Sequence, residues 1–258
     1  MEIVDCHVHL WAGGKPSPAH RQLNALSAAT LLGEMNDAGV SAAVIQPPAW
    51  DPTSNEVAIE AARDFPGRYA TLGWFALDRL EERARVPTWR EQAGMHGFRF
   101  TFVQAREQAW LTDGSLDWLW TAAEAAGLPV ALACTDFLSV VGDIAARHPR
   151  LRLLIDHLGA PLRSTGRDAY ARLPAVLALA RYPNVAVKAS AAPGYSARGY
   201  PFVDVHDYLH AVFDSFGPER MFWGTDITRS EWEKTPGVPG ADPVGVLARA
   251  NAALAAPI

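Results

Sequence analysis

The chain has 258 residues, of which 49% are hydrophobic and 20% are charged, a balance typical of a soluble globular protein. Its net charge of -5 and the lack of a basic run predict no nucleic-acid binding and no attraction to anionic membranes. The N-terminus does not read as a signal peptide, and no apolar run approaches the roughly 18 residues that span a bilayer. Two cysteines, Cys6 and Cys134, fit a reducing compartment, so we expect a cytoplasmic protein.

Short β-branched or aromatic runs alternate with amphipathic stretches, a pattern that indicates repeated βα units around a parallel sheet. The expected strands cover residues 2–7, 42–46, 71–76, 96–100, 129–134, 151–156, 184–189 and 221–224. The expected helices cover residues 30–38, 56–64, 116–126, 138–147, 170–181 and 205–216, with a last helix at 243–255. Pro87 interrupts a weaker helical pattern over residues 80–92.

Eight strands with no dividing linker predict a (β/α)8 TIM barrel that forms a single domain over residues 1–258. The first turn reads Gly13-Gly14-Lys15-Pro16, which is not the glycine pattern of a dinucleotide-binding fold. In a barrel of this kind the chemistry lies at the C-terminal ends of the strands. Polar residues at those ends are therefore the candidates for a site.

The candidate site begins with His7 and His9, which project to the same side of a strand because side chains alternate with a period of two. His157 follows the sixth expected strand and Asp226 follows the eighth. Three imidazoles and one carboxylate suit one divalent metal such as Zn²⁺ or Mn²⁺, with a position open for water. Asp226 could also accept a proton from that water.

Further candidates for substrate binding are more ambiguous. Arg99 at the end of the fourth strand needs an anionic partner, either a substrate carboxylate or a protein acid. For Lys188 the same logic favours a structural ion pair, and for Trp74 packing competes with a role in a pocket wall. Tyr195 and Arg198 are substrate contacts on position alone, in the loop after the seventh strand. The pattern assigns no chemistry to the other histidines, His20, His96, His148, His206 and His210.

Four segments together resemble the amidohydrolase superfamily and its amidohydrolase-2 branch. The segments are Asp5-Cys6-His7-Val8-His9-Leu10-Trp11, His96-Gly97-Phe98-Arg99-Phe100, Leu154-Ile155-Asp156-His157-Leu158-Gly159 and Trp223-Gly224-Thr225-Asp226. The resemblance runs from residue 1 to about residue 229. It implies a barrel hydrolase similar to sugar-acid lactonases, 2-pyrone-4,6-dicarboxylate lactonase and non-oxidative decarboxylases.

The resemblance implies that His7, His9 and His157 form the metal or substrate-polarising site, that Asp226 is the catalytic base, and that Arg99 binds a substrate carboxylate. The family's seventh strand ends in a Lys and a Ser followed by Gly, where this chain has Ala191. The carboxylated lysine of binuclear members has no counterpart, because Ala133-Cys134 follow the fifth strand, so no binuclear centre is expected. The dicarboxylate lactonase of this branch works without metal, and the resemblance therefore allows one divalent metal or none.

We therefore expect a hydrolase of a small, carboxylated metabolite that opens a lactone by attack of water. One alternative is a non-oxidative decarboxylase that uses the same site. An alternative from another class is a catalytically inactive barrel that binds a ligand. The sequence does not specify the substrate, the metal or the oligomeric state, and it is compatible with a homo-oligomer.

Overall fold

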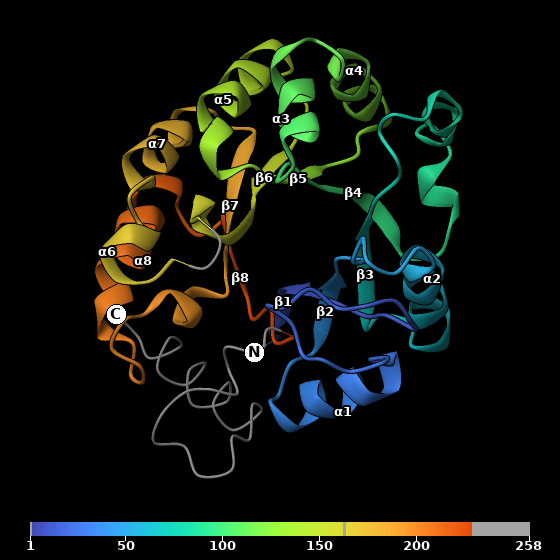
Figure 1. The fold of residues 1–258 in the computed structure, drawn as a ribbon, viewed down its shortest axis with the longest axis horizontal. Coiled ribbons are helices and arrows are strands. Elements are labelled where there is room, and N and C mark those ends of the chain that lie inside the picture. The colour runs from blue at the N-terminus through green and yellow to red at the C-terminus, as the bar shows by residue number, and fades with distance from the viewer. Residues whose placement is uncertain (1, 162–163, 229–258) are drawn as a thin grey trace.

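Eight parallel strands form a ring at the centre of the computed structural model, which describes residues 2–161 and 164–228 (Figure 1). Each strand pairs with the next along the chain, from β1 to β8. The strands are β1 (Val4–Val8), β2 (Ala42–Ile45), β3 (Tyr69–Gly73), β4 (Met95–Thr101), β5 (Val130–Ala133), β6 (Leu153–Ile155), β7 (Val185–Ser190) and β8 (Met221–Gly224). The predicted (β/α)8 TIM barrel is confirmed, and β8 has the predicted bounds.

The ring closes where β8 lies beside β1. Just beyond β8, the main-chain N–H of Asp226 donates to the carbonyl oxygen of His7 at 2.9 Å. The main-chain N–H of Thr225 donates to Asp5 Oδ1, also at 2.9 Å. A Cβ added to Gly224 would lie 3.0 Å from the main-chain nitrogen of His7 and 3.1 Å from Asp5 Oδ1. This close approach of the two strands favours glycine.

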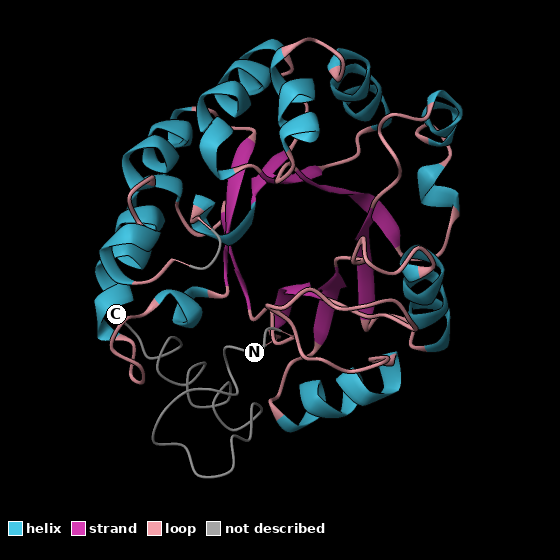
Figure 2. Ribbon diagram, in the orientation of Figure 1, coloured by secondary structure: helices cyan, strands magenta, loops and turns pink. Residues whose placement is uncertain are grey.

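Helices surround the ring of strands (Figure 2). They are α1 (Ala28–Asp37), α2 (Ser54–Asp64), α3 (Ala105–Thr112), α4 (Asp117–Ala126), α5 (Leu138–Arg147), α6 (Gly166–Ala169), α7 (Leu173–Ala178) and α8 (Val203–Phe216). Ser27 caps α1 by accepting a hydrogen bond from the Thr30 main chain, and Gly127 ends α4 in a left-handed conformation. None of the helices in the described ranges could cross a membrane.

Two predicted helical regions differ from the structure. The pattern over residues 80–92 forms two 3-10 helices, η1 (Leu80–Arg85) and η2 (Trp89–Glu91), because Pro87 between them has no N–H to continue a helix. The single helix predicted at 170–181 begins later as α7 and tightens into η5 (Leu179–Arg181), while α3 and α6 were not predicted. The helix predicted at 243–255 lies outside the described residues.

The core lies between the outer face of the sheet and the helices. One apolar cluster links the later strands to α4, α5, α7 and α8, with Ile155 and Val187 fully covered. A second cluster packs β1 and β2 against α1 and α2, through residues such as Val8, Leu31 and Ile45. Burial of these side chains holds the strand ends, and hence the polar residues that follow them, in fixed positions.

Candidate active site

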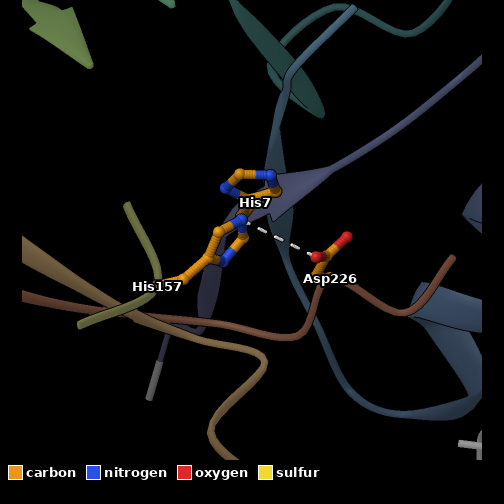
Figure 3. Close-up of side chains that lie close together, drawn as sticks. All are labelled: His7, His157 and Asp226. Carbon is orange, nitrogen blue, oxygen red and sulfur yellow. Dashed lines mark ion pairs between the residues drawn. The ribbon is translucent and has the colours of Figure 1, made fainter. Parts of the chain in front are cut away.

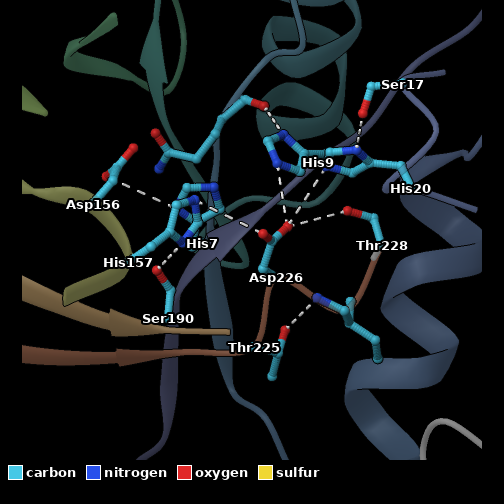
Figure 4. A network of polar contacts seen from close by, with 12 residues as sticks. His7, His9, Ser17, His20, Asp156, His157, Ser190, Thr225, Asp226 and Thr228 are labelled. Carbon is cyan, nitrogen blue, oxygen red and sulfur yellow. Dashed lines mark hydrogen bonds and ion pairs between the residues drawn. The ribbon is translucent and has the colours of Figure 1, made fainter. Parts of the chain in front are cut away.

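Four residues from three different parts of the chain converge at the C-terminal ends of the strands (Figures 3 and 4). His7 belongs to β1 and His9 follows it, His157 lies in the 3-10 helix η4 (Asp156–Gly159) after β6, and Asp226 follows β8. All four side chains are buried. The structure therefore brings together the residues that the sequence analysis selected as metal ligands and catalytic groups.

Asp226 lies at the centre of this group. Its Oδ1 is 3.3 Å from His9 Nε2, and its Oδ2 is 3.9 Å from His157 Nε2. Its backbone has φ 49°, a left-handed conformation that is uncommon for residues other than glycine. The hydrogen bond from its main-chain N–H to His7 holds this turn against β1. The carboxylate is thus directed at the histidines by the barrel closure itself.

The main chain of Gln46, which follows β2, sets the orientation of the His9 ring. Its Nδ1 lies 2.5 Å from the carbonyl oxygen of Gln46. Because a carbonyl only accepts hydrogen bonds, Nδ1 carries a proton in this contact. The other ring nitrogen, Nε2, faces Asp226 Oδ1, which is an acceptor. Such an arrangement calls for a proton or a cation between the two atoms.

His157 is held by a strained turn and by β7. Its backbone has φ 54°, and Leu158 and Gly159 after it also have positive φ. Its Nδ1 lies 2.8 Å from Ser190 Oγ, which leaves Nε2 directed toward Asp226. Consecutive left-handed residues are costly and are found where a site requires them. Ser190 at the end of β7 therefore positions the imidazole.

His7 is a neutral imidazole with unused hydrogen-bonding capacity. Burial, together with the charges of His157 and Lys188, holds the pKa of His7 well below its usual 6.5. Neither ring nitrogen has a hydrogen-bond partner among the described residues, and Nδ1 is 4.0 Å from Asp156 Oδ1. Buried polar atoms without a partner are costly, so these nitrogens are available to a ligand.

Beside the histidines, Asp156 forms ion pairs with two cationic side chains. Arg99 Nε donates to its Oδ2 at 2.8 Å, and Lys188 Nζ lies 3.0 Å from its Oδ1. Burial opposes ionisation of this carboxyl, but the charges of Lys188 and Arg99 hold its pKa well below the usual 3.8. Lys188 is 1% exposed and so forms the structural ion pair that the sequence analysis favoured. It also lines a cavity of about 530 Å³ at the N-terminal ends of the strands.

Arg99 and Trp74 share a second cavity, of about 200 Å³, at the C-terminal ends of β2 to β4. Its lining includes Pro47, Trp74, Arg99, Arg106 and Trp110. The Nε of Arg99 is engaged by Asp156, so the rest of the guanidinium can meet a ligand in this cavity. Trp74 is fixed by a hydrogen bond from its Nε1 to Ser54 Oγ at 3.3 Å. Both residues thus line this cavity, and their contact with a substrate stays a prediction.

Tyr195 and Arg198 are placed differently. Tyr195 is 2% exposed at the end of the 3-10 helix η6 (Ala192–Tyr195), and its ring packs 6.2 Å from that of Tyr170. Arg198 is exposed. The loop is fixed instead by Asp204, whose carboxylate accepts hydrogen bonds from Ser196 and the main chain of Ala197. Substrate contacts by Tyr195 and Arg198 stay a prediction.

His20, to which the sequence analysis assigned no chemistry, also reaches Asp226 (Figure 4). Its Nε2 is 3.9 Å from Asp226 Oδ1, and its Nδ1 is 2.7 Å from Ser17 Oγ. It lies in the loop between β1 and α1, where neither strand alternation nor helical spacing predicts the direction of a side chain. No signal in the sequence would have selected it from the other histidines.

The donors around Asp226 fit a divalent metal. Within residues 2–161 and 164–228, two groups have ligand atoms within 4.8 Å of one another, namely His7, His157 and Asp226, and His9, His20 and Asp226. Imidazole nitrogen and carboxylate oxygen are ligands that Zn²⁺ accepts. A cation fits best where His9 Nε2 and Asp226 Oδ1 face each other at 3.3 Å.

The sequence is similar to those of known proteins. A family model described as amidohydrolase matches residues 4–256. L-fucono-1,5-lactonase from Burkholderia ambifaria is 31% identical over 161 residues, which cover 61% of this chain and 54% of the relative. The match thus spans about half the length of this curated relative.

Solved structures support the fold. An amidohydrolase from Burkholderia multivorans with bound zinc has a TM-score of 0.75 at 24% identity, covering 98% of this chain and 92% of the other. A probable 2-pyrone-4,6-dicarboxylic acid hydrolase from Acinetobacter baumannii with citric acid bound has a TM-score of 0.71 at 15% identity, covering 97% and 92%. At these identities the likeness shows the barrel and no more.

Proposed function

Because the chain belongs to the amidohydrolase family, we propose that it hydrolyses a lactone of a small, carboxylated metabolite by attack of water on the ring carbonyl. The observation that carries this proposal is the Asp226 carboxylate, buried among histidines at the end of the barrel where such enzymes place their chemistry. The lactonase similarity supports the reaction class. A cytoplasmic location is part of the same proposal.

In the proposed mechanism, Asp226 accepts the proton of the attacking water, and His7, His9 and His157 polarise the carbonyl. His157 then protonates the leaving oxygen as the tetrahedral adduct collapses and the ring opens. His7 can contact the developing oxyanion because its nitrogens have no described partner.

One divalent metal, Zn²⁺ or Mn²⁺, is part of the proposal, with His7, His9, His157 and Asp226 as the expected ligands. When bound, such an ion supplies Lewis-acid polarisation of a carbonyl and lowers the pKa of a water to about 7. The zinc bound to the Burkholderia multivorans structure supports this expectation. The histidines could also polarise the carbonyl directly, without metal.

Substrate recognition is proposed for Arg99, Lys188, Trp74, Tyr195 and Arg198. Arg99 is the best placed of these, because its guanidinium lines the cavity beside Trp74 while its Nε is held by Asp156. A guanidinium binds a carboxylate through two parallel hydrogen bonds. Lys188, in contrast, would act only through Asp156, because its ammonium is buried in that ion pair.

A panel of sugar-acid 1,4- and 1,5-lactones and pyrone carboxylates tests the proposal. Proton release in a pH-stat and mass spectrometry of the product should show addition of one water for at least one lactone. Release of CO₂ without ring opening would identify a decarboxylase instead. Tight binding of a panel member without turnover, in chain loaded with Zn²⁺ or Mn²⁺ or treated with chelator, would identify a catalytically inactive ligand-binding barrel.

A further inference from the structure

The two oxygens of Asp226 face different histidines (Figure 4). Oδ1 lies 3.3 Å from His9 Nε2 and 3.9 Å from His20 Nε2. Oδ2 lies 3.9 Å from His157 Nε2. Each oxygen therefore belongs to its own group of donors, and the expected ligand set of His7, His9, His157 and Asp226 is divided between the two sides of one carboxylate.

The His9 and His20 side has the orienting contacts that metal sites use. A histidine that binds metal through one ring nitrogen usually has its other nitrogen hydrogen-bonded to a carbonyl, a carboxylate or a water, which fixes the ring. His9 meets this requirement through the Gln46 carbonyl, and the Ser17 hydroxyl does the same for His20. On the other side of Asp226, the Ser190 hydroxyl holds His157 in the same way, but His7 has no such partner among the described residues.

Charge also separates the two sides. The buried cluster of Asp156 with Arg99 and Lys188 carries one net positive charge, because two cations share one carboxylate. Asp156 Oδ1 lies 4.0 Å from His7 Nδ1 and 3.0 Å from Lys188 Nζ, so this positive cluster borders the His7 side of the site. His9 and His20 lie on the other side of Asp226, next to its Oδ1.

The distances suit a small tetrahedral ion. Ligand atoms at about 2.0–2.1 Å from Zn²⁺ in a tetrahedron are separated from each other by roughly 3.3 Å. The His9 and Asp226 atoms are already at 3.3 Å, and the His20 atom, at 3.9 Å, would need to move by about half an ångström. This leaves the fourth position for water or substrate.

We infer that one divalent ion of the zinc type is held by His9, His20 and Asp226 Oδ1, with His20 as a ligand supplied by the loop between β1 and α1. His7, His157 and Asp226 Oδ2 are then left to act on water and substrate. The inference rests on the proposed function only for the presence of a metal. The added ligand, His20, lies outside the four segments that resemble the amidohydrolase family.

Metal titration tests this assignment without any substrate. Metal-free chain is titrated with Zn²⁺ by calorimetry, and with Co²⁺ by visible absorption, which reports the coordination geometry. The variants are His20→Gln, Ser17→Ala and His7→Gln. His210→Gln, which changes an exposed histidine of α8, is the matched control. Circular dichroism and thermal unfolding of each metal-free variant check that it is folded.

We expect about one Zn²⁺ per chain, because the three protein ligands form a single site. His20→Gln should weaken Zn²⁺ binding by about a hundredfold or more, and Ser17→Ala by about tenfold, in line with losses measured for orienting partners. His7→Gln and His210→Gln should bind Zn²⁺ within about threefold of the unchanged chain. Ser17→Ala keeps every ligand, so it decides the question if His20→Gln fails to fold.

Opposite results overturn the assignment. If His7→Gln abolishes binding while His20→Gln and Ser17→Ala bind normally, the ion belongs to the His7 and His157 side. If the unchanged chain binds neither Zn²⁺ nor Co²⁺, the metal site is wrong. Lactone hydrolysis by metal-free chain would then still support the proposed function, so the two failures can be told apart.

Discussion

Asp226 donates its main-chain N–H to the carbonyl oxygen of His7 at 2.9 Å, so the proposed base and a proposed polarising histidine are joined through their backbones. This bond lies where the last strand of the barrel meets the first. The geometry of the site therefore depends on the contact between β8 and β1. Substitutions at this contact should lower both the stability of the chain and its activity.

Gly224→Ala should destabilise the chain by about 1–3 kcal/mol, because its Cβ would meet main-chain and side-chain atoms of β1 at 2.9–3.1 Å. Urea unfolding followed by circular dichroism measures the change. Gly33→Ala in α1 is the control, since nothing lies within 4 Å of its Cβ and alanine favours a helix. Equal stability of the two variants would contradict the close approach of β8 to β1 at Gly224.

Asp156→Asn should cost about 3–5 kcal/mol of unfolding free energy, because it leaves the buried charges of Lys188 and Arg99 without their carboxylate. Asp117→Asn removes the exposed partner of Arg147 and should cost less than about 1 kcal/mol. Chemical denaturation of both variants gives the comparison. Similar small losses would mean that the Asp156 cluster is not a buried ion pair.

Asp5 predicts a pH dependence of stability. Burial raises the pKa of this carboxyl from 3.8 to about 6, although it accepts hydrogen bonds from Thr225 and His7. The folded chain therefore keeps a proton that the unfolded chain releases, and this contribution is full below pH 3.8 and lost as the pH rises through about 6. The loss is on the order of 3 kcal/mol.

Asp5→Asn should remove that dependence, because an amide does not titrate and can still accept hydrogen bonds from the main chain. Unfolding free energies of both proteins at several pH values between 4 and 7 measure the difference. The unchanged chain should lose stability relative to the variant as the pH rises. Parallel curves would show that Asp5 does not titrate in this range. Asp156, whose pKa is lowered, acts only at more acidic pH.

Arg99→Lys should raise KM for a carboxylated lactone by about tenfold with little change in kcat, because an ammonium cannot hold Asp156 and a substrate carboxylate in the same fork geometry. KM for a lactone without a carboxylate should change much less. Arg147→Lys, at an exposed position of α5, controls for the substitution itself. Equal effects on both lactones would remove Arg99 from carboxylate recognition.

The barrel could be predicted from the sequence because short runs rich in apolar residues alternate with turns and helices. The predicted bounds of β8, 221–224, match the structure. The helical bounds were harder to predict. Pro174 in the first turn of α7 marks where that helix begins, but α6 has only four residues and α3 is weakly amphipathic, so these two helices give little signal.

The convergence of His7, His157 and Asp226 followed from one rule, that parallel strands of a barrel bring their C-terminal ends together. His20 and the choice of Asp156 as partner for both Arg99 and Lys188 did not follow. A loop side chain is directed by contacts such as that of His20 with Ser17, and an ion pair by the register of neighbouring strands. Neither is encoded in residue spacing.

The most direct measurement of the central claim is kcat/KM of Asp226→Asn on the best lactone of the panel. Asparagine keeps the shape of the side chain but cannot take a proton from water. The account predicts a fall of at least about a hundredfold, with circular dichroism unchanged. A variant that retains kcat/KM within about threefold of the unchanged chain would contradict the assignment of Asp226 as the base.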